Sequence, residues 1–266
     1  MRYDLRAMTL RARNPRRPQI TFRDIRPPAT LATDLYQSGY SDVIAIWSAA
    51  AERIVAEYER TLSTMVTDSP ADLQAQLDAA EAEVQRLFLV LTPRLRSWLF
   101  RVEGFVRGRW RGAVLTATGV DISTLVGPED ARETLEIVLE RNVALVKDVS
   151  AQARGRISDA VFRGLTERQP AREVAKEVRN AVGMARDRSI RIASHQLGSL
   201  SETLAEERRR ESGLDSWAWV ASHKRNFRPE HQARDGKVYT DATAPKDLPR
   251  RLPGCGCTSR AVMVFE

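Results

Sequence analysis

The sequence predicts a mainly α protein, with an elongated helical body and a small C-terminal α+β module of short strands. Three observations favour this class. Apolar residues recur every three or four positions through most of residues 42–211, as they do on the buried face of a helix. After Gly213 this period gives way to short apolar runs that are typical of strands. Basic segments flank the body at both ends, and the first of them is rich in proline.

Residues 1–30 form the first expected part, an Arg/Pro-rich arm. Its arginines outnumber Asp4 and Asp24 enough to give most of the chain's net charge of +7. Its prolines favour an extended conformation over a helix. Guanidinium groups suit phosphate and carboxylate partners, so we expect the arm to bind nucleic acid or an acidic protein, with a solvated tail as the alternative. The candidate binding residues are Arg2, Arg6, Arg11, Arg13, Arg16, Arg17, Arg23 and Arg26.

Residues 31–213 form the expected helical body, whose apolar stripes are packing residues. Turns separate its helices, and residues that favour the start of a helix, such as serine or threonine before proline, mark where each new helix begins. Pro170 marks one such turn, and Gly213 follows the last helix where a residue of positive φ belongs. The expected helix starts lie near Asp42, Ser69, Thr92, Gly127 and Ala185.

Residues 214–266 form the expected C-terminal module. Residues 217–221, 237–239 and 261–265 predict short strands, and the loops between them contain several prolines and an Asp235-Gly236 turn. A unit of this size with so many loops buries little apolar surface by itself. It therefore needs either docking against other elements or a bound metal.

The module contains the residues with metal-binding chemistry. Cys255 and Cys257 form a Cys-Gly-Cys pair that is too close for an unstrained mutual disulfide, and His231 precedes them. Thiolate and imidazole are ligands that Zn²⁺ prefers, so we expect these three residues to hold a structural zinc ion. The expected fourth ligand is His223, Asp235 or water. The alternative is a pair of surface thiols beside two solvated histidines.

Other functional classes have little support in the sequence. The longest clear apolar run, residues 87–91, is too short for a membrane span, and the first twenty residues lack the apolar core of a secretory signal. No P-loop, dinucleotide-binding turn or His-Glu-x-x-His helix is present. A metal-dependent nuclease or hydrolase that uses His223, His231 and Asp235 remains the alternative function.

An ordered series of motifs connects this chemistry to a known family. The motifs are Trp219, then Arg228-Pro229 with His231, then Asp235-Gly236, then Cys255-Gly256-Cys257. Together with helical segments near Glu140 and Ile190, they resemble the phage head morphogenesis (minor head protein) family typified by the F protein of phage Mu, over residues 140–264. The structural motif residues in this resemblance are Trp219, Arg228, Pro229 and Gly236.

Five positions depart from the family motif. Ser194 and His195 stand where the family has Arg and Asp before Gln. Lys224 and Asn226 stand where the family has Asp and Arg, and Gly256 stands where it has Arg between the cysteines. If those charged residues pair in the family, this chain must hold its loop differently.

The resemblance implies a minor capsid or head morphogenesis protein of a tailed phage or prophage, without enzymatic activity. The implied location is the virion head near the portal vertex, and the bacterial host cytoplasm during assembly. The implied partners are the portal protein and the major capsid protein or scaffold. Packaged double-stranded DNA is a further implied partner, and no membrane is involved.

Overall fold

The computed structural model describes residues 2–12, 17–64 and 69–265. The chain forms two compact units, each assembled from segments that are distant in the sequence. We call them the sheet unit (Met1–Leu31, Leu99–Val138 and Ser194–Glu266) and the helical unit (Ala32–Trp98 and Leu139–Ala193). The sheet unit thus combines segments that the sequence analysis assigned to the arm, the body and the module.

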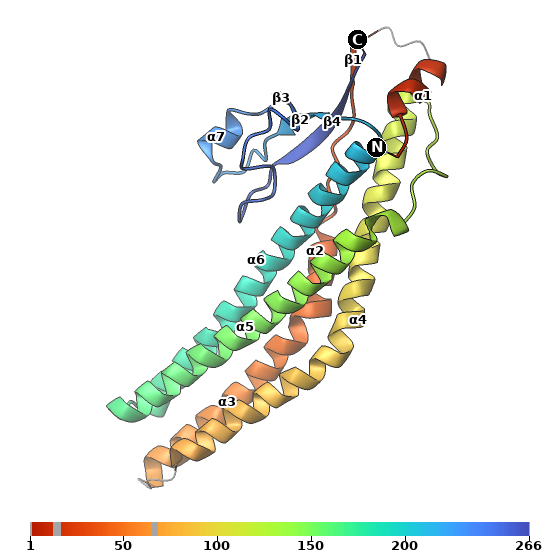
Figure 1. The fold of residues 1–266 in the computed structure, drawn as a ribbon. Helices are drawn as coiled ribbons and strands as arrows, with labels where there is room; N and C mark the ends of the chain where they lie inside the picture. The colour runs from red at the N-terminus through yellow and green to blue at the C-terminus, as the bar shows by residue number, and fades with distance from the viewer. Residues whose placement is uncertain (1, 13–16, 65–68, 266) are drawn as a thin grey trace. The chain divides into compact units, whose positions relative to one another are not determined.

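Helices predominate in the described residues, which confirms the predicted mainly α class (Figure 1). No helix among these residues has the length and apolar character needed to cross a membrane. In chain order the elements are α1 (Leu5–Ala12), β1 (Gln19–Thr21), α2 (Thr30–Gly39), α3 (Ser41–Thr64), α4 (Ser69–Thr118), the 3₁₀ turn η1 (Glu129–Ala131), α5 (Arg132–Glu167), α6 (Ala171–Glu211), β2 (Ser216–Val220), α7 (Pro229–Gln232), β3 (Val238–Thr240) and β4 (Thr258–Val264).

The helical unit is packed through the apolar stripes that the sequence shows, with polar anchors among them. Trp47 of α3 is fully buried, and its indole N–H donates to the hydroxyl of Ser150 on α5 at 2.8 Å. The hydroxyl of Tyr58, also on α3, donates to the carbonyl oxygen of Gln169 at 2.8 Å. Gln169 lies in the turn between α5 and α6, so the turn predicted around Pro170 is confirmed.

Two of the expected helix starts are wrong because the helices continue through them. α4 contains Pro93 in its interior, and α6 is already helical well before Ala185. Proline at position 93 removes the hydrogen bond that would reach the carbonyl of Leu89. The side chain of Leu89 is 82% exposed, so this carbonyl lies at the helix surface, where water can replace the missing donor.

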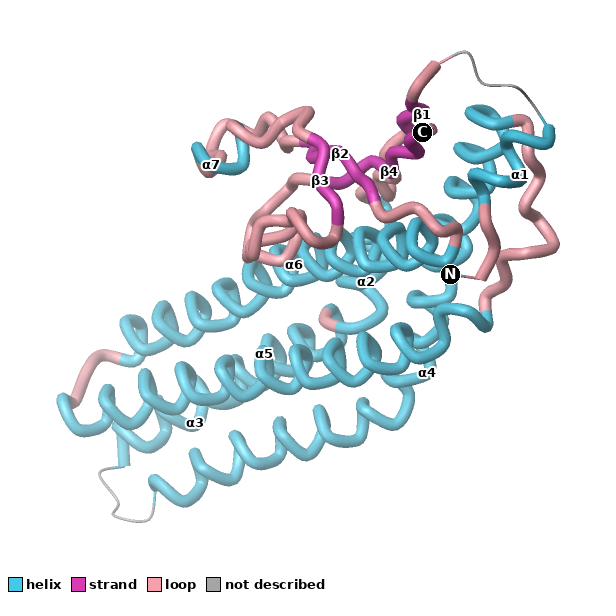
Figure 2. The backbone as a smooth tube through the Cα atoms, turned by 45° about the horizontal axis from the view of Figure 1, so that its top comes forward, coloured by secondary structure: helices cyan, strands magenta, loops and turns pink. Residues whose placement is uncertain are grey.

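The four strands of the sheet unit form one antiparallel sheet in the order β1-β4-β2-β3 (Figure 2). Every residue of β2 is buried, as expected for a central strand that carries two tryptophans. The strands predicted near residues 217, 237 and 261 correspond to β2, β3 and β4. The edge strand β1 was not predicted, because it lies in the arm.

The arm does not have the extended conformation that the sequence analysis expected. Residues 5–12 form α1, since the prolines of the arm all follow them and Asp4 Oδ1 accepts the N–H of Ala7 as an N-terminal cap at 2.9 Å. The backbone N–H of Leu5 donates to the carbonyl of Ser212 after α6, and β1 then pairs with β4. The chain's own sheet unit therefore orders this part of the arm.

A buried arginine holds the end of α6 within the sheet unit. Arg208 is 1% exposed, and its guanidinium group donates to carboxylate oxygens of Glu103 and Glu211, both at 2.9 Å. It also donates to the carbonyl oxygen of Gly127 at 3.0 Å. A carboxylate oxygen of Asp130 accepts from it at 3.3 Å as well. Burial of an arginine is tolerated here because its donors are shared among these four acceptors.

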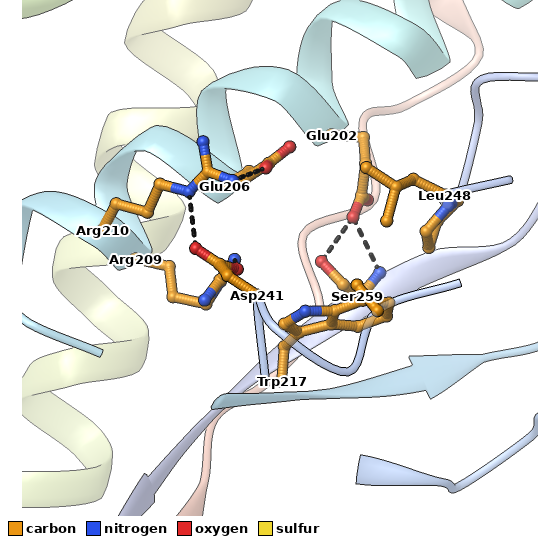
Figure 3. Close-up of a pocket in the computed structure, with 10 residues that line it drawn as sticks. Glu202, Glu206, Arg209, Arg210, Trp217, Asp241, Leu248 and Ser259 are labelled. Atoms are coloured by element: carbon orange, nitrogen blue, oxygen red, sulfur yellow. Dashed lines mark hydrogen bonds and ion pairs between the residues drawn. The ribbon is translucent and has the colours of Figure 1, made fainter. Parts of the chain in front are cut away.

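A buried carboxyl group attaches β4 to α6 (Figure 3). Glu202 is 7% exposed, and its Oε1 accepts the backbone N–H of Ser259 at 3.0 Å and the hydroxyl of the same residue. Burial raises the pKa of Glu202 to about 7, although the hydrogen bonds from Ser259 and the charge of Arg250 act to lower it. The carboxyl group is therefore partly protonated near neutral pH.

We expect Glu202 to make the folded protein less stable as the pH rises. Its pKa increases from 4.5 to about 7 on folding, so between these values the folded state binds more protons than the unfolded state. The effect is about 3 kcal/mol when complete. Glu202→Gln keeps a hydrogen-bond acceptor without the titration. Its free energy of unfolding, measured by urea denaturation from about pH 5 to about pH 8, should therefore fall less than that of the wild type.

The control for this experiment is Glu140→Gln, which changes an exposed carboxylate on α5. It should keep the pH dependence of the wild type. Identical pH dependence in wild type and Glu202→Gln would show that the carboxyl group does not titrate in this range.

Candidate metal centre

The candidate ligands come from two loop segments of the sheet unit. His231 lies on α7, a single helical turn that begins with Pro229 at its first position, after Arg228 in an extended conformation. Cys255 and Cys257 lie just before β4. Gly254 precedes them with φ of 71°, a conformation that a residue with a Cβ rarely adopts.

The structure brings these three side chains together, as the sequence analysis expected. Nδ1 of His231 lies 3.5 Å from Sγ of Cys255 and 3.7 Å from Sγ of Cys257. All three residues are buried, and their ligand atoms lie within 4.8 Å of one another. We call them the ligand group.

The distances in the ligand group fit a tetrahedral zinc ion. Zinc binds imidazole nitrogen at about 2.0–2.1 Å and thiolate sulfur at about 2.3 Å, so two such ligands at a tetrahedral angle lie about 3.6 Å apart. Both measured nitrogen–sulfur distances agree with this value. The three residues present are therefore suited to Zn²⁺ in both chemistry and geometry.

The other nitrogen of His231 has a carboxylate partner. Nε2 lies 2.9 Å from Oδ2 of Asp247, and Oδ1 of Asp247 accepts from Arg234 at 2.7 Å. Burial acts to raise the pKa of Asp247, but hydrogen bonds from Arg234 and His231 outweigh it and hold the pKa below its ordinary value. An ionised Asp247 accepts the N–H of Nε2, so in a neutral imidazole the lone pair of Nδ1 would face the two sulfurs. This is the carboxylate–histidine arrangement found behind many zinc ions.

Aromatic side chains surround the ligand group. Trp219 is fully buried and meets the His231 ring edge-on, with ring centroids 5.0 Å apart. Trp217 packs beside Trp219, and both belong to one cluster with the two cysteines. The ligand group thus occupies the centre of the small core of the C-terminal module.

Burial disfavours a free thiolate at this place. It raises the pKa of the Cys257 thiol, and the neighbouring Cys255 raises it further. Both cysteines are free, so neither is consumed in a disulfide. A bound cation would supply the positive charge that two adjacent thiolates need.

Comparison with known proteins shows which family the segment around the ligand group resembles. Residues 155–260 match the family model of Phage Mu protein F like protein. This match confirms the resemblance to the head morphogenesis family that the motif series predicts. We call residues 155–260 the Mu F-like segment; it covers less than half of the chain and contains the whole ligand group.

One curated relative is an uncharacterized protein of Haemophilus influenzae. It is 24% identical over 148 residues, which make up 55% of this chain and 33% of that protein. The matching part thus spans about a third of the relative's length. No solved structure matches the chain.

Two of the predicted candidates in the Mu F-like segment lie outside the ligand group. His223 is exposed, and its Nε2 lies 3.2 Å from Oδ2 of Asp235. Oδ1 of Asp235 accepts the backbone N–H of Ala221 at 2.8 Å. Among the residues that the structure describes, neither joins the three clustered ligands, because this pair instead closes the loop after β2.

The other motif residues have structural positions. Arg228 donates to the carbonyl oxygen of Pro253 at 3.0 Å and so joins the loop before α7 to the loop before the cysteines. Gly236 has φ of 74°, and its N–H donates to the carbonyl of Trp219 at 2.9 Å. Both contacts position the two ligand-bearing loops.

The arginines of the arm lie outside the Mu F-like segment and have mixed surroundings. Arg2 forms an ion pair with Asp130, and Arg26 forms one with Asp24. Arg6 is half-buried. Arg13 and Arg16 lie outside the described residues. The exposed arginines of the arm that form no ion pair among the described residues are Arg11, Arg17 and Arg23.

Sequence reasoning missed Asp247 and Arg234, which support His231. Neither stands at a spacing from His231 that a known zinc motif would mark. The only available signal was an acidic residue in the loop between the histidine and the cysteines. The role of Asp247 becomes visible only when that loop is placed against α7.

Proposed function

We propose that the protein is a head morphogenesis protein of a tailed phage or prophage. The observation that carries this proposal is the match of residues 155–260 to the Phage Mu protein F like family. The matched segment includes all of α6, the strands β2 and β3, and the ligand group. The similarity therefore covers the part of the chain in which the metal-binding chemistry is concentrated.

In this proposal the protein bridges the portal protein and the inner capsid, where it meets the major capsid protein or the scaffold. Its place is the virion head near the portal vertex, after assembly in the host cytoplasm. Long helices with charged exposed faces, such as α5 and α6, provide surfaces for such contacts. The exposed arginines of the arm suit an acidic partner, either protein or packaged DNA.

We expect the protein to join heads when it is produced together with the head proteins of its own phage. Heads purified by density gradient should contain it, and the portal protein should be retained on the tagged chain in affinity purification. A portal protein from an unrelated phage serves as the control. Absence of the chain from purified heads, together with no retention of its own portal protein, would contradict the proposed function.

We propose a structural role rather than an enzymatic one for the metal centre. The alternative nuclease needs His223 and Asp235 beside His231. His223 and Asp235 instead pair with each other, while His231 is held by Asp247. The buried ligand group suits an ion that stabilises a fold.

We further propose that the structural ion is Zn²⁺, bound by His231, Cys255 and Cys257. The protein purified from zinc-containing medium should then contain one zinc per chain by elemental analysis. His231→Gln, and the double change Cys255→Ser with Cys257→Ser, should remove it. Asp247→Asn should weaken zinc binding about 10- to 100-fold, because it removes the partner that orients the imidazole.

The matched control is His223→Gln, which removes an exposed imidazole from the same module. It should leave the zinc content unchanged. Chelation should increase hydrogen exchange in residues 221–257 of the wild type, since the ion joins two loops, and should leave the exchange of α3 unchanged. Zinc content that is insensitive to His231→Gln would contradict this assignment.

We expect DNA binding by the arm to depend steeply on salt. Removing one arginine–phosphate interaction should lower the slope of log K against log salt concentration by about 0.9. Replacing Arg11, Arg17 and Arg23 with glutamine should therefore flatten the salt dependence, measured by fluorescence anisotropy with duplex DNA. A flat dependence in the wild type would contradict the proposal. The control variant replaces three exposed arginines of the long helices: Arg141, Arg172 and Arg179.

A further inference from the structure

A small pocket opens beside the ligand group in the C-terminal module. All three ligand residues line it, together with polar residues that include Asn226, Arg228 and Gln232. Its volume of about 20 Å³ is enough for one or two atoms of the size of a water molecule. The pocket therefore has room for a small chemical group beside the three ligand residues.

Zinc with three protein ligands keeps a fourth position for a ligand from elsewhere. In the part of the chain that the structure describes, the ligand group consists of His231, Cys255 and Cys257 alone. The nearby carboxylates of Asp247 and Asp235 are already bonded, the first to His231 and Arg234, the second to His223 and Ala221. Because the three ligands all border the pocket, the fourth position is reached from there.

Three cationic side chains lie close to this pocket and to the cysteines. The side chain of Lys224 lies against Gly256, with Nζ 3.0 Å from the place that a Cβ on residue 256 would occupy. Arg228 lines the pocket itself and is held by the carbonyl of Pro253. Arg250 donates to the carbonyl of Cys255 at 3.3 Å. Three cations thus surround the Cys-Gly-Cys turn.

Gly256 is required for this arrangement of charge. A Cβ at that position would lie 2.7 Å from Cε of Lys224 and 2.8 Å from Cβ of Ser222. The first contact could be relieved by moving the lysine, but the second involves an atom close to the backbone. Glycine at this position therefore lets the Lys224 ammonium group lie next to the cysteines.

From these observations we infer that the fourth position of the metal binds a carboxylate of an acidic partner protein. The inference rests on the zinc site proposed above. The Lys224 and Arg228 cations favour an anion, and a carboxylate is the anionic side-chain group that binds zinc directly. A glutamate or aspartate of a neighbouring head protein would then complete the coordination shell, so that docking and metal binding are coupled.

The test uses the full-length protein loaded with Co²⁺, whose visible absorption bands report the coordination shell. Acetate, as the carboxylate probe, is titrated in chloride-free buffer at constant ionic strength, and inorganic phosphate is titrated in parallel. We expect acetate to shift the bands in a saturable way and phosphate to have a much weaker effect. Lys224→Met should raise the half-saturating acetate concentration about three- to five-fold, the effect expected of one exposed cation.

The matched control is Lys237→Met, which removes an exposed positive charge elsewhere in the same module and should leave the acetate titration unchanged. Tetrahedral Co²⁺ bands that do not respond to acetate would overturn the open position while leaving the metal site intact. A stronger response to phosphate would overturn the carboxylate assignment. Failure to bind Co²⁺ at all would overturn the metal site and the inference together.

Discussion

The C-terminal module depends on the convergence of one imidazole and two thiols. The module has short strands and long loops, and its apolar cluster is centred on Trp217 and Trp219. Such a core is too small to fix two loops by apolar burial alone. The loop that carries α7 and the loop that precedes β4 meet at the ligand group and at polar contacts such as that of Arg228 with Pro253. A metal ion at that point would supply the connection that the core lacks.

The rest of the sheet unit positions this module through α6. Glu202 holds the backbone of Ser259, two residues after Cys257, while Arg208 joins the end of the same helix to Glu103. Both side chains are buried, and both have hydrogen-bond partners. The two ionisable groups that α6 buries here are therefore compensated by polar neighbours. β4 therefore has fixed contacts on two sides, with α6 through Glu202 and with β1 and β2 in the sheet.

Much of this fold could be predicted from local patterns, because periodicity and chemistry are local properties of the sequence. The buried stripe around Trp47, the residue of positive φ at Gly213 and the grouping of His231 with the cysteines all follow from them. The failures involve compensation by distant residues or by solvent. Pro93 was expected to begin a helix, yet an exposed surface tolerates its missing donor. The arm was expected to be extended, yet its partner is β4, which lies at the other end of the sequence. Asp247 was missed because its partner, His231, is also not its neighbour in the sequence.

The departures from the family motif change where charge lies beside the cysteines, without changing its sum. The motif places an acid at the position of Lys224 and an arginine between the cysteines, a combination with no net charge. Here those two positions hold lysine and glycine, which together contribute one positive charge. Asn226, however, replaces a second arginine of the motif, so the three positions carry the same net charge in the motif and in this chain. The two positions are neighbours in the structure, since the lysine side chain lies in the space that a larger residue at position 256 would need. The position of an ammonium group beside the ligand group is therefore a property of this chain rather than of the motif.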